Sequence, residues 1–123
     1  METIKFRGKR IDNGEWVYGG IAYTEHLGIG FHIMETFQTA HQVIPESVGQ
    51  FIGLLDSDGN EIYNGMYVTA EFDLGESQNH ESMEISGHIS YDEKKCAFYI
   101  KTKTGFQPIH EDSAMLISIK VIA

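Results

Sequence analysis

Short runs of alternating apolar and polar residues, separated by turn residues, recur along this chain of 123 residues. Successive side chains of a β-strand point to opposite faces of the sheet, so this alternation is typical of half-buried strands. In "KCAFYIKT" it places Cys96, Phe98 and Ile100 on one face, and it predicts a core position for Cys96. We therefore expect a mainly β chain.

The segments with this character are rich in β-branched and aromatic residues, which favour strands. They span residues 15–23, 30–35, 40–44, 49–55, 61–72, 83–92, 95–102 and 115–122. The pairs Asn13-Gly14 and Asp58-Gly59 tolerate the positive φ angles of tight hairpins. The segments are therefore expected to pair with one another as antiparallel strands.

Helical structure is expected only as a short turn over residues 45–50, which begins with proline, and as a second turn after Pro108. No repeat, low-complexity tract or linker divides the sequence. We expect a single domain over residues 1–123, built as a barrel or a strongly bent antiparallel sheet with one or two short helical turns.

The distribution of charge limits the choice of partners. The net charge is −9, and residues 11–93 contain fifteen Asp or Glu residues and no Lys or Arg. A negative surface repels nucleic acid and attracts basic partners. We therefore expect no direct nucleic-acid binding, although acidity that serves only solubility stays an open explanation.

One polar segment, "EFDLGESQNHESMEI" over residues 71–85, interrupts the strand pattern and is expected to form an acidic loop. Loops on a rigid β scaffold often carry binding function, but they are also often plain connections. The candidate binding residues are its carboxylates, followed by three from the turn "DSDGNE": Glu71, Asp73, Glu76, Glu81 and Glu84, then Asp56, Asp58 and Glu61.

The stretch "DSDGN" resembles the start of a calcium-binding loop, with oxygen donors at Asp56, Asp58 and Asn60. Such a loop needs glycine at its sixth position and a bidentate Glu at its twelfth, and this chain has Glu61 and Tyr67 there. We expect a hairpin turn instead, and no cofactor.

The six histidines lack the spacing of a zinc-binding helix. A metal site built from separate strands, using His32, His41, His88 and His110, stays an open alternative. Nucleophile elbows and phosphate-binding loops are missing, so we expect no enzyme. The strand aromatics would suit a platform for single-stranded nucleic acid, but such platforms lie in positively charged grooves, and residues 11–93 contain no Lys or Arg.

Two segments resemble the YopX family of small proteins from phages and prophages. They are "IKFRGKRIDNGEWVYGG" (4–20) and "VGQFIGLLDSDGNEIYNGMYV" (48–68), together about a third of the chain. Met66 departs from the Asp that is usual in the family. The resemblance implies a phage origin and an SH3-like barrel around the shared hairpin, and it implies no catalytic residue.

We expect a non-enzymatic binding protein of phage origin, whose acidic surface engages a basic nucleic-acid-binding groove of a host protein such as an RNA-guided nuclease. A self-associating assembly module, and hence a homo-oligomer, is the alternative. A single cysteine permits no internal disulfide, and no apolar run is long enough to span a bilayer. We expect a cytoplasmic protein of the bacterial host, without membrane contact.

Overall fold

The computed structural model describes residues 4–24, 30–36, 39–73, 82–109 and 115–123, with only the backbone described at Thr24 and Met115. By contacts, the chain separates into two compact units, Met1–Gly53 and Leu54–Ala123. The described elements are β1 (Phe6–Lys9), β2 (Trp16–Thr24), β3 (Gly30–Met34), β4 (Ala40–Gln42), the 3-10 helix η1 (Pro45–Ser47), β5 (Gly49–Leu55), β6 (Glu61–Tyr63), β7 (Tyr67–Asp73), β8 (Ser82–Asp92), β9 (Ala97–Lys101), β10 (Phe106–Pro108) and β11 (Met115–Val121).

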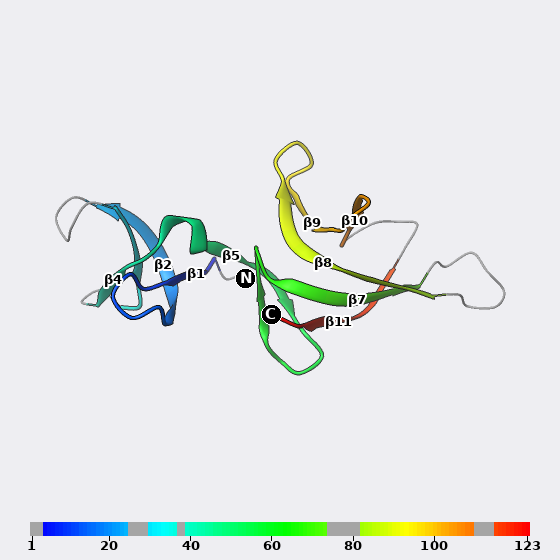
Figure 1. Cartoon of the computed structure of the whole chain (residues 1–123), viewed down its shortest axis with the longest axis horizontal. Coiled ribbons are helices and arrows are strands. Elements are labelled where there is room, and N and C mark those ends of the chain that lie inside the picture. The colour runs from blue at the N-terminus through cyan, green and yellow to red at the C-terminus, as the bar shows by residue number, and fades with distance from the viewer. Residues whose placement is uncertain (1–3, 25–29, 37–38, 74–81, 110–114) are drawn as a thin grey trace. The chain divides into compact units, whose positions relative to one another are not determined.

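The strands form two antiparallel sheets, in the orders β4-β3-β2-β1-β5-β6 and β10-β9-β8-β7-β11 (Figure 1). Each order begins and ends with a different strand, so neither sheet closes on itself within the described residues. The mainly β prediction is confirmed. The prediction left two architectures open, a barrel and a bent antiparallel sheet. The structure has antiparallel sheets and no closed barrel in the described residues, so the SH3-like barrel implied by the resemblance is not formed as a closed barrel.

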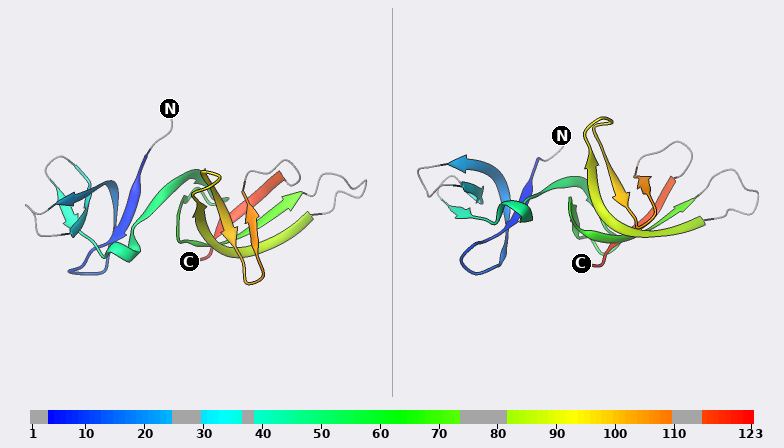
Figure 2. Two further views of the ribbon diagram at one scale, coloured as in Figure 1. Left: turned by 90° about the horizontal axis from the view of Figure 1, so that it is seen from above. Right: turned by 45° about the horizontal axis from the view of Figure 1, so that its top comes forward.

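The first unit bends at a glycine in β2. This strand pairs with β1 through Gly19 and with β3 from Gly20 onward (Figure 2). A Cβ atom on Gly19 would lie 2.1 Å from the carbonyl oxygen of Met34, and φ at Gly19 is +155°. Only glycine permits this close approach, so it fixes the place where β2 changes partner. Behind the bend, Val17, Ile33 and Val43 form a small buried core.

The second unit is centred on β7, whose alternation is regular. Val68, Ala70 and Phe72 are buried, and the residues between them are half-buried on the opposite face. Other buried apolar side chains of this unit come from several strands: Ile62, Tyr63, Ile89, Ile100 and Ile119. The period of two that predicted the strand therefore also separates its core face from its outer face.

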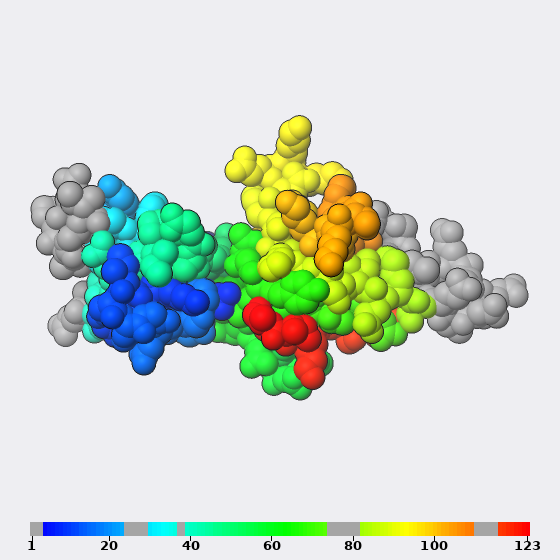
Figure 3. Space-filling view, in the orientation of Figure 1, coloured from blue at the N-terminus to red at the C-terminus, as the bar shows by residue number. Residues whose placement is uncertain are grey.

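The long strand β8 changes partner along its length. It pairs with β7 from Ser82 to His88 and with β9 from His88 to Asp92, and it curves strongly (Figures 1 and 2). At the change, a Cβ on Gly87 would lie 2.2 Å from the carbonyl oxygen of Lys101. A groove of about 510 Å³ is lined by Met83 to Ser86 and by the β9–β10 turn. The two segments, yellow-green and orange, are neighbours in Figure 3.

Most sequence predictions of the elements are confirmed. The helical turn lies at Pro45–Ser47, within the expected 45–50. The expected strand 61–72 is two strands, because Gly65 adopts φ +95° in a turn between β6 and β7. The short strands β1 and β10 were not predicted. The turn expected after Pro108 falls mainly on residues 110–114, outside the described residues.

Cys96 is a correction. It was predicted as a core residue of a strand, but it is exposed in the turn before β9, with φ +50°. The strand begins only at Ala97. Cysteine is apolar, so Cys96 fits the alternation of a strand. In the structure, however, this position belongs to the turn of the hairpin and has a positive φ.

Candidate functional site

The β7–β8 ladder brings three of the predicted acidic residues onto one face. Glu71 and Asp73 alternate with the buried Ala70 and Phe72, so they lie on the outer face of β7. The register places Glu84 of β8 directly opposite Glu71. We call Glu71, Asp73 and Glu84 the acidic ladder. Glu76 and Glu81 lie outside the described residues.

Neither of the two residues directly opposite Glu71 carries a positive charge. On β8 its partner is Glu84, and on β11 its partner is Ser118. Like charges directly opposite each other in an antiparallel pair are destabilising. The acidic ladder therefore lowers the stability of the sheet that carries it, and it concentrates negative charge on the outer face of that sheet.

Polar and aromatic contacts continue the same face beyond the acidic ladder. Thr69 Oγ1 and Ser86 Oγ are 2.8 Å apart in a hydrogen bond. Tyr67 and His88 follow, with their rings edge to face at a centroid distance of 5.1 Å. These contacts hold adjacent side chains in place, so the acidic ladder stands on a regular strand pair rather than on the loop that the sequence predicted.

Asp56 has a different role from the one predicted for it. Its side chain is buried, with a relative exposure of 6%. Oδ1 accepts hydrogen bonds from the backbone N–H groups of Asp58 (3.0 Å) and Asn60 (2.8 Å). Oδ2 accepts from the N–H of Val121 (3.1 Å) and the side-chain amide of Asn60 (3.2 Å). Both oxygens are engaged within the chain, so we assign Asp56 to the fold.

The pKa of Asp56 reflects these contacts. Burial alone raises the pKa of the carboxyl group, but hydrogen bonds from the Val121 backbone and from Asn60 and Asp58 outweigh it, and the pKa is lowered. The charged form of Asp56 is therefore part of the folded state.

The other two candidates in this turn also have partners inside the chain. Asp58 is 3.9 Å from the ammonium group of Lys120, with both side chains well exposed. The hydroxyl of Tyr63 donates to Glu61 Oε1 at 3.0 Å. The turn itself is a hairpin, as predicted: Asp56 N–H donates to the Asn60 carbonyl, and Gly59 has φ +85°.

The histidines do not meet in the described part of the chain. His32 is buried, with Nδ1 3.1 Å from the carbonyl oxygen of Gly30, and His88 packs against Tyr67. His41 Nε2 is 3.6 Å from Glu35 Oε2. Among the described residues, no group of three His, Cys, Asp or Glu side chains is arranged to hold a metal ion. His110 lies outside those residues.

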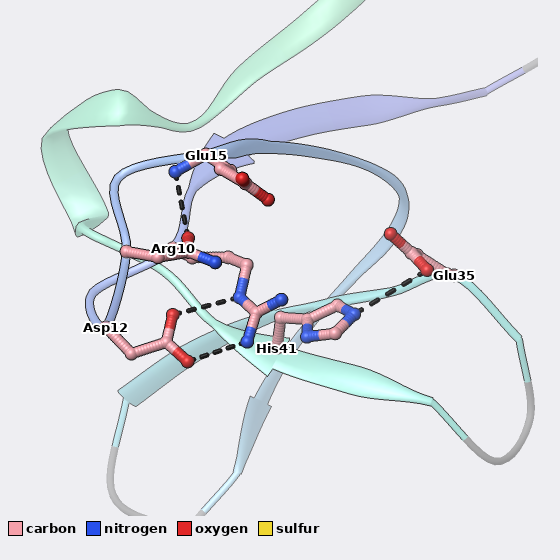
Figure 4. Close-up of polar contacts among 6 residues, drawn as sticks. Arg10, Asp12, Glu15, Glu35 and His41 are labelled. Atoms are coloured by element: carbon pink, nitrogen blue, oxygen red, sulfur yellow. Dashed lines mark hydrogen bonds and ion pairs between the residues drawn. The ribbon is translucent and has the colours of Figure 1, made fainter.

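A separate polar cluster lies in the first unit, between the β1–β2 connection and β4 (Figure 4). Arg10 donates to both oxygens of Asp12, at 2.9 and 2.6 Å, beside a small hollow of about 260 Å³ that His41 also lines. The hydrogen bond to Arg10 lowers the pKa of Asp12 against the opposing effect of desolvation. Because Arg10 and Asp12 balance each other's charge, this cluster offers no strong site for an ion.

Sequence reasoning missed a second charged surface, on β1 and β2. Lys5, Arg7 and Lys9 lie against the rings of Trp16 and Tyr18 there. The sequence contains a signal for this surface: three cations at alternate positions are followed by two aromatic residues, also at alternate positions. It was not recognised because β1 was not predicted as a strand.

In the described residues no helix is long and apolar enough to cross a membrane. The fold and the site together define a small, mainly β protein that carries acidic residues on the outer face of a strand pair. The chain belongs to the YopX family: a family model described as YopX protein matches residues 5–122, which confirms the resemblance. No curated protein and no solved structure matches it significantly.

Proposed function

We propose that this protein is a non-enzymatic binding protein of phage origin, whose acidic ladder engages a basic nucleic-acid-binding groove of a host protein. The observation that carries the proposal is the direct opposition of Glu71 and Glu84, with Asp73 on the same outer face of β7. Family membership supports the phage origin and supplies no catalytic residue.

The chemistry of such a contact follows from the carboxylate group. Arg and Lys bind carboxylates and phosphates through similar charge-assisted hydrogen bonds. Alternate residues along one face of a strand are about 7 Å apart, so Glu71 and Asp73 present a row of anions on a firm backbone. A groove that evolved for a phosphate backbone, such as that of an RNA-guided nuclease, has the matching row of cations.

The loss of sheet stability caused by the acidic ladder favours a binding role over a role in solubility alone. Charges that serve solubility can be placed anywhere on the surface, and they need not lie opposite each other in a sheet. Residues that lower stability where they stand are typical of functional sites. Glu71 and Glu84 fit that description.

The test compares host proteins retained by three tagged proteins at low salt and released at high salt. They are the natural chain, a ladder variant (Glu71→Gln, Asp73→Asn, Glu84→Gln) and a control variant (Glu15→Gln, Glu46→Gln, Glu93→Gln). Both variants lose three negative charges. We expect the ladder variant alone to lose a nucleic-acid-handling protein identified by mass spectrometry, and to lose inhibition of that protein's activity.

Retention of the same host protein by the ladder variant, or its equal loss from the control variant, would refute the proposal. In the first case the acidic ladder is not the contact. In the second, only total charge matters.

A self-associating assembly module is the second candidate, because each sheet ends in an edge strand on both sides in the described structure. Strand edges with unpaired N–H and C=O groups are templates for pairing with another chain. Light scattering on the purified protein separates the two candidates: a discrete oligomer that persists in the ladder variant favours assembly.

A further inference from the structure

The outer face of β1 and β2 in the first unit combines cations and aromatic rings in adjacent rows. Lys5, Arg7 and Lys9 occupy every second position along β1 and the residue before it. Between them, Phe6 packs against the buried core, and Gly8 lies so close to Val43 that an added Cβ would be 3.0 Å from the Val43 Cβ. The three cations therefore share the face opposite the core.

The neighbouring strand β2 supplies the rings. Its register places Tyr18 opposite Arg7 and Trp16 opposite Lys9. The guanidinium carbon of Arg7 lies 3.7 Å from the centroid of the Trp16 ring, and the Lys9 ammonium lies 5.2 Å from it. Lys5 is 6.0 Å from the Tyr18 ring centroid. These are cation–π contacts, which hold the charged groups in place above the sheet.

The strand on the other side of β1 adds little bulk opposite Arg7 and a ring beside Lys5. Gly49 of β5, which has no side chain, lies opposite Arg7. One step further, Phe51 donates its N–H to the Lys5 carbonyl at 2.7 Å and so adds a third ring beside Lys5.

We infer that this cation–aromatic face binds single-stranded nucleic acid. Rows of cations about 7 Å apart along a strand can follow a phosphate backbone, and neighbouring rings can stack with exposed bases. An acidic peptide would use the cations but not the rings. A duplex hides its bases from the rings, so an unpaired strand fits both features.

The inference departs from the expectation drawn from net charge. That expectation rested on a total of −9 and on residues 11–93 without a cation. The pairing of β1 with β2 and β5 gathers three cations and three rings locally, and the total charge averages over this arrangement. The inference is independent of the proposed function, because the acidic ladder lies in the other unit.

Trp16 makes the test direct, because it is the only tryptophan in the chain. Titration with single-stranded oligo(dT) or oligo(U) of about 15 nucleotides, within the usual range of site sizes, is expected to quench its fluorescence. Anisotropy of a labelled oligonucleotide gives the affinity at several salt concentrations. The matched duplex is expected to bind more weakly than the single strand.

Two pairs of variants locate the site. The first pair compares Lys5→Gln, Arg7→Gln and Lys9→Gln, combined, with Lys101→Gln, Lys103→Gln and Lys120→Gln, combined. Both variants lose three positive charges, but only the first is expected to lower the salt slope of log K, by about 2 for three phosphate contacts.

The second pair compares Tyr18→Leu with Tyr23→Leu, two exposed tyrosines of β2. Loss of one stacked base is expected to weaken binding at least about fivefold for Tyr18→Leu only. Circular dichroism and thermal unfolding verify that each variant is folded.

Several results would overturn the inference. One is no quenching and no anisotropy change up to about 100 µM oligonucleotide at low salt, the weak end of non-specific binding. Another is an equal effect of the two triple variants, or of the two tyrosine variants. A third is stronger quenching by poly-glutamate than by the oligonucleotide, which would assign the face to an acidic protein.

Discussion

Asp56 and Glu84 are both acidic residues of the second unit, but their surroundings give them different roles. The oxygens of Asp56 accept four hydrogen bonds inside the chain. Glu84 is exposed and faces another glutamate. The sequence could not separate the two, because one hydrogen-bond donor to Asp56 is the backbone of Val121, 65 residues further along the chain.

Acid should weaken the fold through Asp56. The lowered pKa of Asp56 means that its charged form stabilises the folded state above the ordinary carboxyl pKa of about 4. This contribution is lost as the pH falls from there through the lowered pKa of the folded state. Urea unfolding at pH 7 and pH 3 should therefore show a smaller loss of stability on acidification for Asp56→Asn than for the natural chain.

The same variant should already be less stable at pH 7, because its amide cannot accept all four hydrogen bonds. Asp58→Asn is the matched control, since Asp58 is exposed and its carboxylate makes only a long ion pair, 3.9 Å, with the ammonium group of Lys120. Equal pH dependence in Asp56→Asn and the natural chain would contradict the role assigned to Asp56.

At the scale of elements, the sequence predicted which face of a strand each side chain lies on better than it predicted which residue of the neighbouring strand lies opposite. The alternation in β7 correctly separates Val68, Ala70 and Phe72 from the residues between them. It could not predict that Glu71 lies opposite Glu84, because alternation leaves the register between two strands open. The segment 71–85 was expected to be a loop, yet β7 continues to Asp73 and β8 begins at Ser82.

Reversing one charge in the acidic ladder should stabilise the sheet. Glu84→Lys replaces a like-charge pair with an opposite-charge pair, for a gain on the order of 1 kcal/mol. The unfolding temperature of this variant should be a few degrees above that of the natural chain at low salt. Glu46→Lys, which makes the same change of charge outside any strand, should raise it less. An equal rise in both variants would mean that total charge, not the pairing, is responsible.

At the scale of the whole molecule, the organisation of the chain stays partly a prediction. The contacts separate two compact units, each with buried apolar residues of its own. The charges are unevenly divided along the sequence: Lys5, Arg7, Lys9 and Arg10 all precede the long stretch without cations. This uneven distribution of the basic residues is visible in the sequence, but the net charge of −9 does not reveal it.

Salt should stabilise the protein as a whole. At a net charge of −9 the folded chain repels itself, and added salt screens this repulsion. We expect the unfolding temperature to rise between about 0.05 and 0.5 M NaCl at pH 7, and to change little near the isoelectric point of about 5.0. A fall in unfolding temperature with salt at pH 7 would show that attractive surface pairs dominate instead.

The hydrogen bond from Val121 to Asp56, together with the pairing of β11 with β7, has a consequence for synthesis on the ribosome. Chains emerge from their N-terminal end, and compact units fold as they appear. The first unit contains its own core within Met1–Gly53 and can form early. The turn at Asp56 cannot be completed until β11 has emerged. During that interval β7 presents one unpaired edge, which is when the nascent chain is most exposed to mispairing.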